Sequence, residues 1–166
     1  MTNIYNQILN SKIGNQKLLA ILLDPDKIDL DTIPVLIEKI NQSPATHIFI
    51  GGSIVNNTII DELILKIKND CDLPIVLLPR NPSQISDQAD AILFLSLISG
   101  RNPEFLIEHQ VNAAPILKRS QLEIISTGYI LIESGSETAV ELVSKTKPLD
   151  RNNLDLVLAT AQYGEM

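Results

Sequence analysis

Two hydrophobic patterns alternate along the chain. Short, nearly uninterrupted runs of Ile, Leu and Val are typical of strands that are buried on both faces of a parallel sheet. Five such runs predict strands at residues 18–23, 47–50, 75–78, 91–95 and 129–132. Apolar residues spaced three and four apart predict helices at residues 4–9, 31–41, 58–69, 103–111 and 152–162.

The order of these elements indicates an α/β protein. A helix is followed by strand and helix repeated about five times, which predicts a parallel sheet covered by helices with right-handed crossovers. In open and in closed sheets of this kind, ligands bind beyond the carboxyl ends of the strands. Polar residues just after each apolar run are therefore the candidates for a site.

Composition narrows the class of protein. The 166 residues are 45% hydrophobic and carry a formal charge of −7, with a single Cys and no Trp. This acidic balance argues against nucleic acid as a partner, because binding a phosphate backbone requires clustered Lys and Arg. The lone Cys71 cannot form an internal disulfide, no signal peptide is visible, and the apolar runs are too short to cross a bilayer. We expect a soluble cytoplasmic protein.

The first predicted strand ends in Asp24-Pro25-Asp26-Lys27. Carboxylates at a strand's carboxyl end can hold a divalent cation, since Mg²⁺ takes one or two carboxylates and leaves positions for water and substrate phosphates. Asp and Pro are also preferred turn residues, so a tight turn without a ligand is the alternative. The residues alone leave both interpretations open.

The second predicted strand ends in Gly51-Gly52-Ser53. Paired glycines let the backbone approach a ligand closely, and the serine can donate to a phosphate or coordinate a metal. An ordinary turn into a helix is the alternative. Neighbouring strand ends lie roughly 5 Å apart in a parallel sheet, so we expect Ser53 and Asp24 to lie side by side on one edge.

Other polar residues follow the remaining strands. Arg80, in Pro79-Arg80-Asn81-Pro82, can balance an anion or lie in solvent. Tyr129 begins the last predicted strand, and its hydroxyl needs a partner, either another core group or a substrate hydroxyl. His47 is predicted in the core and His109 on a helix surface, and neither pattern supports a zinc site or a nucleophile triad.

Five motifs at the strand ends resemble one family when they are taken in order. They are Leu22-Leu23-Asp24-Pro25-Asp26-Lys27, Gly51-Gly52-Ser53, Leu78-Pro79-Arg80-Asn81-Pro82, Ser99-Gly100-Arg101-Asn102-Pro103 and Thr127-Gly128-Tyr129-Ile130-Leu131-Ile132-Glu133. From about Lys17 onward, the chain resembles the geranylgeranylglyceryl phosphate synthase family and its heptaprenylglyceryl phosphate synthase relatives. Each motif is modest by itself, but five in the right order at matching strand ends are specific.

The resemblance implies a fold and an activity. Members of that family are TIM barrels that join a polyprenyl diphosphate to sn-glycerol 1-phosphate with Mg²⁺, so we expect a prenyltransferase of ether-lipid synthesis that uses geranylgeranyl diphosphate. Carried over by position, Asp24 and Ser53 are the Mg²⁺ ligands and Tyr129 contacts the glycerol phosphate. No side chain is assigned as a catalytic residue. The apolar barrel flank is expected to hold the isoprenoid chain, and the full-length protein is expected to form a homo-oligomer.

Two departures from the family pattern qualify this expectation. Some members carry Lys two residues before the metal-binding Asp, where this chain has Leu22. The family also continues past the equivalent of Met166 with a Glu-containing segment and two glycine-rich phosphate loops. A complete (β/α)₈ barrel needs about 250 residues. We therefore expect residues 1–166 to form a single partial TIM-barrel domain, truncated after about five βα units, with the sixth to eighth strands absent.

Two alternatives follow from the same residues. The first is a barrel fragment that cannot turn over because part of the site is missing. The second is an open, doubly wound domain that binds a phosphorylated ligand, with Asp24 and Asp26 as a receiver-like acidic cluster. A sequential strand order, 1-2-3-4-5, excludes the doubly wound domain.

Overall fold

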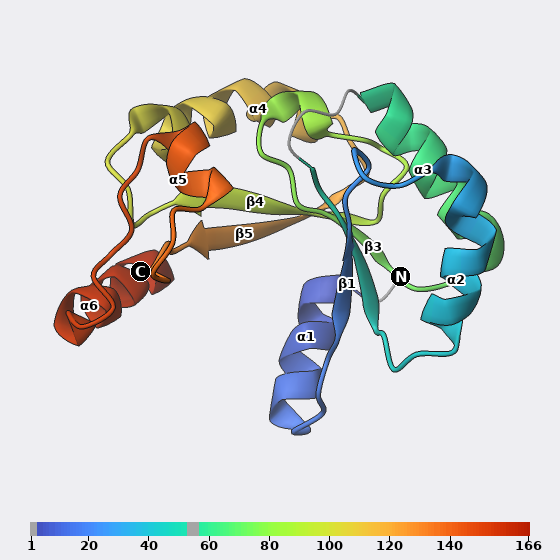
Figure 1. Cartoon of the computed structure of the whole chain (residues 1–166), viewed down its shortest axis with the longest axis horizontal. Coiled ribbons are helices and arrows are strands. Elements are labelled where there is room, and N and C mark those ends of the chain that lie inside the picture. Colours follow the sequence, from blue (N-terminus) through green and yellow to red (C-terminus); the bar gives the residue numbers. More distant parts are fainter. Residues whose placement is uncertain (1–2, 53–56) are drawn as a thin grey trace. The chain divides into compact units, whose positions relative to one another are not determined.

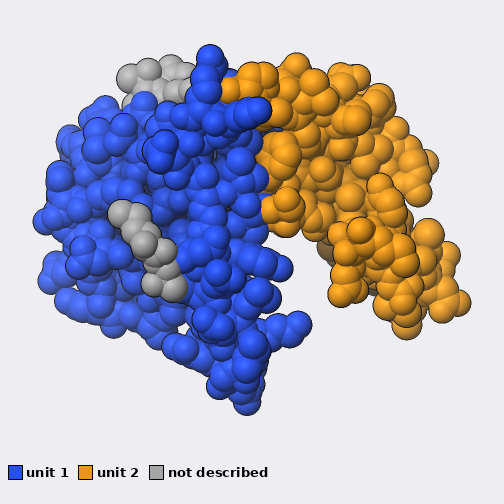
Figure 2. All heavy atoms as spheres, turned by 180° about the vertical axis from the view of Figure 1, so that it is seen from behind, with its two compact units in different colours: residues 1–93, 116–125 blue, residues 94–115, 126–166 orange. Residues whose placement is uncertain are grey.

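The computed structural model describes residues 3–52 and 57–166, which form two compact units. Unit 1 comprises Met1–Leu93 and Ile116–Ile125, and unit 2 comprises Phe94–Pro115 and Ser126–Met166 (Figure 2). The helices and strands, labelled in Figure 1, are α1 (Ile4–Ile13), β1 (Ala20–Leu23), α2 (Ile33–Asn41), β2 (His47–Ile50), α3 (Asn57–Asp70), β3 (Ile75–Leu77), β4 (Ala91–Leu97), α4 (His109–Leu117), β5 (Glu123–Tyr129), α5 (Ala139–Ser144) and α6 (Leu154–Glu165).

The five strands form one sheet in the order β1-β2-β3-β4-β5. β1 pairs in parallel with β2, β2 with β3, and β3 with β4. This sequential order confirms the predicted parallel sheet and excludes the doubly wound alternative, in which the strand order reverses at a switch point.

The register of unit 1 aligns the strands residue by residue. One row across the ladder joins the partners Leu23, Ile50, Leu77 and Ile92. The row before it joins Leu22, Phe49, Val76 and Ala91. Because successive side chains point to opposite faces of a strand, the two rows stand on opposite faces of the sheet. Leu23, Ile50 and Leu77 are also the last residues of β1, β2 and β3, so the loops after these three strands begin along one edge.

The helices α2 and α3 lie along one side of β1–β3 in Figure 1. Their buried residues recur at the predicted helical spacing, with Ile33, Ile37 and Ile40 in α2 and Leu63, Ile64 and Ile67 in α3. The predicted helix 31–41 begins instead as a 3₁₀ turn, Leu30–Thr32, and becomes α-helical at Ile33. The periodicity thus located both helices and their buried faces.

Helix α1 packs against the other face of the sheet near the amino ends of the strands. Its buried Ile4 clusters with Val76, Ala91 and Ile125. The Glu123 carboxylate, at the start of β5, accepts hydrogen bonds from the backbone N–H groups of Ile4 at 2.6 Å and of Tyr5 at 2.8 Å. First-turn N–H groups have no partner within a helix, so this carboxylate satisfies two of them and attaches α1 to the sheet.

Asp90 connects three elements just before β4. Its carboxylate accepts from Lys68 Nζ of α3 at 2.7 Å and from the N–H of Ile75 at 2.8 Å. Its backbone carbonyl accepts from the N–H of Glu123 at 3.1 Å. The amino ends of β3, β4 and β5 are therefore joined through one residue.

The last strand was predicted at the wrong residues. β5 spans Glu123–Tyr129, so Tyr129 ends this strand, whereas the sequence predicted a strand at 129–132 that begins there. β5 mixes Glu, Ser, Thr and Gly with Ile and is only partly buried, so it lacks the uninterrupted apolar run used as the signal. Of the predicted strand, Ile132 keeps one isolated parallel bridge, with Leu149.

Unit 2 also differs from the prediction in its helices. The segment predicted as a helix at 103–111 begins as a π-helical turn, Glu104–Glu108, and continues as α4. Helix α6 extends to Glu165, beyond the predicted end at residue 162. Helix α5 was not predicted. It begins with a capping box between Thr138 and Glu141. Hydrogen bonds from Leu131 N–H to Ser99 Oγ and from Asn102 Nδ2 to the Ser144 carbonyl connect the loops of this unit.

His47 is a core residue, as predicted, with 5% of its surface exposed. Its Nδ1 lies 2.8 Å from Thr46 Oγ1, and burial lowers the pKa of the imidazole because the charged form loses its hydration. Burial therefore favours the neutral form of His47. No helix in the described ranges is both long and apolar enough to cross a lipid bilayer.

Glu123→Ala is expected to destabilise the protein by about 1–3 kcal/mol, because it leaves two backbone donors of α1 without their acceptor. Urea denaturation of the variant and the parent gives the difference in the free energy of unfolding. Glu133→Ala, at an exposed position in unit 2, serves as the control and is expected to change that free energy by less than about 0.5 kcal/mol. Equal losses in the two variants would contradict the role given to Glu123.

His47 is expected to make the folded state less stable as the pH falls. Its folded pKa is lowered, so stability is unaffected above the ordinary His pKa of about 6.5 and is lost as the pH drops below that value toward the folded pKa. His47→Gln should flatten the decline in stability between about pH 7 and pH 5. His109→Gln, which changes the chain's other histidine, should retain that decline. Melting temperatures measured across this range test the prediction, and an unchanged slope in His47→Gln would refute it.

Candidate functional site at the carboxyl ends of the strands

Asp24 directly follows β1 and begins a tight turn. Its Oδ1 accepts from the Asp26 N–H at 3.1 Å, and the Lys27 N–H donates to the Asp24 carbonyl at 2.9 Å. Lys27 Nζ lies 2.8 Å from Asp24 Oδ2, and the lysine side chain is 78% exposed whereas the aspartate side chain is 19% exposed. Asp24 therefore begins a tight turn, and this turn holds a carboxylate at the edge of the sheet.

The surroundings of Asp24 favour its ionised form. Burial raises the pKa of the carboxyl, but hydrogen bonds from Lys27 and the Asp26 N–H, with the positive charges of Lys27 and Arg80, lower it further than burial raises it. The pKa of Asp24 therefore lies below its ordinary value. Asp24 is an anion at neutral pH, as a metal-binding carboxylate must be.

Gly51 follows β2 where the backbone of the next strand comes very close. The Gly51 N–H donates to the Leu23 carbonyl at 3.2 Å, so the ends of β1 and β2 are adjacent, as predicted. A Cβ at Gly51 would lie 2.3 Å from the carbonyl oxygen of Leu78. Only glycine fits here, because the obstructing atom belongs to the backbone. The predicted metal ligand Ser53 lies outside the described residues.

The loop after β3 is connected to the loop after β2 through Gln84. The Gln84 Nε2 donates to the Gly52 carbonyl at 3.1 Å, and the Gln84 Oε1 accepts from the Arg80 N–H at 2.7 Å. The side chain is buried, with 2% of its surface exposed. The sequence analysis identified Arg80 and missed Gln84, because a glutamine in a polar loop carries no signal of its burial.

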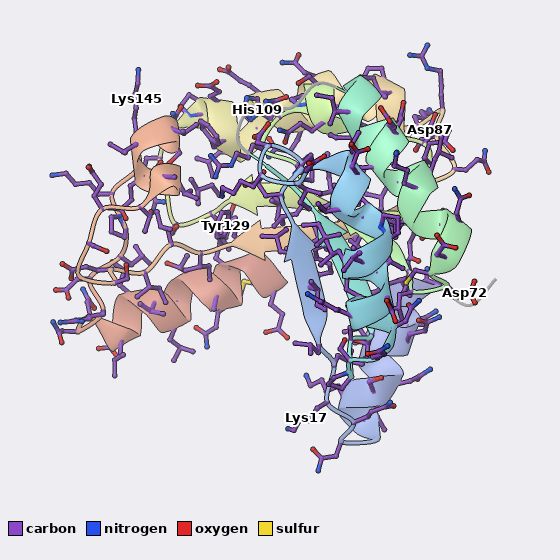
Figure 3. The ribbon with its side chains drawn as sticks, turned by 45° about the vertical axis from the view of Figure 1, so that its right-hand side comes forward. Lys17, Asp72, Asp87, His109, Tyr129 and Lys145 are labelled. Carbon is purple, nitrogen blue, oxygen red and sulfur yellow. The ribbon has the colours of Figure 1, made fainter. Side chains whose placement is uncertain are left out.

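Tyr129 belongs to unit 2, where it ends β5 (Figure 3). Its side chain is partly buried, and no hydrogen bond joins its hydroxyl to another group among the described residues. The sequence left two partners open for this hydroxyl, a core group or a substrate hydroxyl. No core group of the described residues bonds to it. Near the carboxyl end of β4, Arg101 Nη1 donates to the Gly100 carbonyl at 2.6 Å.

Asp24 supplies one carboxylate of the kind that Mg²⁺ binds in proteins. Within residues 3–52 and 57–166, no three His, Cys, Asp or Glu side chains gather into a metal-binding group. A single ionised carboxylate at a strand end suits Mg²⁺, which keeps several waters and binds substrate phosphates alongside one or two protein carboxylates. Lys27 is exposed, and its ammonium group would move away from Asp24 Oδ2 when an ion binds there.

Comparison with known proteins adds a family assignment. The sequence matches the PcrB family over residues 11–165. It is 67% identical over all 166 residues to a geranylgeranylglyceryl phosphate synthase of Flavobacterium johnsoniae, of which it covers 68%. It is 45% identical over 163 residues to a protein of the same name from Chitinophaga pinensis, of which it covers 65%.

A solved structure agrees with the fold. The crystal structure of (S)-3-O-geranylgeranylglyceryl phosphate synthase from Thermoplasma acidophilum, in complex with its substrate sn-glycerol-1-phosphate, matches with a TM-score of 0.90 and 28% identity. The match covers 99% of this chain and 66% of that one. The predicted fold of TIM-barrel type is confirmed, and the chain spans about two-thirds of the length of these relatives.

Gly51→Ala is expected to displace the ends of β2 and β3 and to lower the free energy of unfolding by about 1–3 kcal/mol, because the added methyl group meets the Leu78 carbonyl. Gly14→Ala is the matched control, since the nearest atom to a Cβ there lies 3.3 Å away. Chemical denaturation compares the two variants with the parent. A Gly51→Ala protein as stable as Gly14→Ala would contradict the close approach.

Proposed function

Because the chain belongs to the PcrB family, we propose that its protein transfers a polyprenyl group, geranylgeranyl in particular, from the diphosphate to a hydroxyl of sn-glycerol 1-phosphate. One observation supports the proposal most directly: a geranylgeranylglyceryl phosphate synthase is 67% identical over the whole chain. The ionised Asp24 at the carboxyl end of β1 supplies the local chemistry that supports it.

Asp24 and Ser53 are the proposed ligands of Mg²⁺. Bound there, the ion would neutralise the negative charge of the diphosphate leaving group. Two anions close together repel each other, so a divalent cation would offset the repulsion between the Asp24 carboxylate and the diphosphate.

The reaction exchanges one carbon–oxygen bond for another. The bond between the allylic carbon and the diphosphate oxygen breaks, the glycerol hydroxyl oxygen bonds to that carbon, and the hydroxyl proton passes to the departing diphosphate or to water. The chain's part is to position the diphosphate and stabilise the charge that collects on it.

The other substrate contacts are also proposed from the chain's own residues. Tyr129 is the proposed contact for glycerol phosphate, with a hydroxyl that has no partner among the described residues. Leu22 stands on the face of the sheet that α1 partly covers, and it is 54% exposed. We propose that Leu22 contacts part of the isoprenoid chain. Homo-oligomer formation and cytoplasmic location stay predictions from the sequence.

A second candidate concerns the 166-residue chain taken alone. The chain spans about two-thirds of the length of its relatives. In this candidate role Asp24 and its neighbours bind a diphosphate without turning it over. Product formation by the complete gene product, but not by residues 1–166, would distinguish binding from catalysis.

Asp24→Asn in the complete gene product is expected to lower the rate of prenyl transfer by at least about 100-fold, because a neutral amide cannot replace the carboxylate as a Mg²⁺ ligand. Labelled sn-glycerol 1-phosphate, geranylgeranyl diphosphate and Mg²⁺ give the rate from the labelled lipid product. Asp31→Asn, which changes an exposed acid of the 3₁₀ turn before α2, is the control and should retain the parent rate.

Two results would count against the proposal in different ways. Near-normal turnover in Asp24→Asn would remove Asp24 from the metal site and leave the reaction standing. A parent protein that forms no ether product, with or without Mg²⁺, would overturn the reaction itself.

A further inference from the structure

We infer that Gln84 is a positioning residue that holds the loops around the proposed diphosphate site, an inference that rests on the proposed function. Gln84 touches neither the proposed ion nor a substrate. It acts on two loops, the one that follows β2 and the one that follows β3, and both begin at the edge where Asp24 lies.

The two hydrogen bonds use both ends of one amide. The Gln84 Nε2 donates to the Gly52 carbonyl and the Gln84 Oε1 accepts from the Arg80 N–H. A primary amide can donate and accept at once, whereas a carboxylate only accepts and an ammonium only donates. At 2% exposure the side chain is shielded from water, so neither loop can readily exchange its contact for a solvent molecule.

Both contacts hold residues next to the proposed chemistry. Gly52 follows Gly51, whose N–H donates to the carbonyl of Leu23, the residue before Asp24. Arg80 contributes positive charge at Asp24. Gln84 thereby connects the end of β2 beside Asp24 to the backbone of the cation that acts on Asp24.

The loop that carries Gln84 has a second attachment. Ser86 is buried and its Oγ donates to the Asp61 carboxylate of α3. This contact is independent of Gln84 and lies two residues further along the chain. Removing the Gln84 amide should therefore release Gly52 and Arg80 while the loop stays fastened to α3, so a variant at this position is expected to fold.

Gln84→Met in the complete gene product is the central variant, because it keeps the length of the side chain and loses both hydrogen bonds. Calorimetric titration with inorganic pyrophosphate in the presence of Mg²⁺ should show about tenfold weaker binding than in the parent. The KM for the prenyl diphosphate should rise by a similar factor, with a smaller change in kcat.

Thr46→Val is the matched control at the opposite end of the same sheet. The Thr46 Oγ1 accepts from the Leu19 N–H and donates to the Leu19 carbonyl, so this near-isosteric variant also removes two contacts with the backbone. It should lower the melting temperature as Gln84→Met does and leave pyrophosphate affinity unchanged. A merely structural role for Gln84 predicts the same affinity in both variants.

Gln84→Glu adds a readout that depends on pH. A protonated glutamic acid can donate to the Gly52 carbonyl and accept from the Arg80 N–H, whereas the ionised form can only accept. Burial raises the pKa of a carboxyl group, so this glutamic acid should gain its proton as the pH falls. The pyrophosphate affinity of the variant, divided by that of the parent at the same pH, should therefore rise as the pH is lowered from about 8 to about 5.5.

Three results would overturn the inference: parent-like pyrophosphate binding by Gln84→Met, an equal loss of affinity in Thr46→Val, or a parent that binds no pyrophosphate with Mg²⁺. A parent that binds Mg²⁺ and pyrophosphate but forms no prenyl ether would refute the proposed function alone. In that case a tenfold loss in Gln84→Met would still support the positioning role.

Discussion

The parallel register of β1 to β4 is the constraint on which the site depends. Leu23, Ile50 and Leu77 are partners in one row and are the last residues of β1, β2 and β3, so the chain leaves these three strands along one edge. Residues distant in sequence, such as Asp24 and Gly51, then follow directly paired positions, with the Gly51 N–H on the Leu23 carbonyl. A shift of one residue in this ladder would turn the buried row to the opposite face and separate the loops. Packing of α2 and α3 on that row therefore stabilises the site as well as the sheet.

The two ends of the strands in unit 1 have opposite characters. At the amino end, Ile4 of α1 lies in an apolar cluster and Glu123 satisfies the first-turn N–H groups. At the carboxyl end the side chains are polar, and backbone groups of Gly52 and Arg80 are held by the buried Gln84. One end thus gains stability from burial, while the other presents a carboxylate and cations that a ligand can engage. This division is the general arrangement of parallel α/β proteins, in which stability and chemistry occupy opposite ends of the strands.

Hydrophobic patterning predicted the features that depend on burial, and it failed where burial is partial or where contacts are specific. It located α2, α3 and the first four strands because their apolar residues are nearly continuous or helically spaced. It misplaced β5, because the Ser, Thr and Gly residues of this strand interrupt the apolar pattern although the strand belongs to the sheet. Asp24 was predicted as a site residue because it follows a recognisable strand. Gln84 was not, because its importance arises from two backbone partners that only the fold brings within reach.

The central claim is that Asp24 binds a divalent cation together with the diphosphate. Mn²⁺ bound to the complete gene product in place of Mg²⁺ can be examined by electron–nuclear double resonance with inorganic pyrophosphate present. The account predicts a ³¹P coupling that shows direct Mn²⁺–phosphate contact on the protein, and the loss of the protein-bound signal in Asp24→Asn. The same protein-bound signal in Asp24→Asn and in the parent would contradict it.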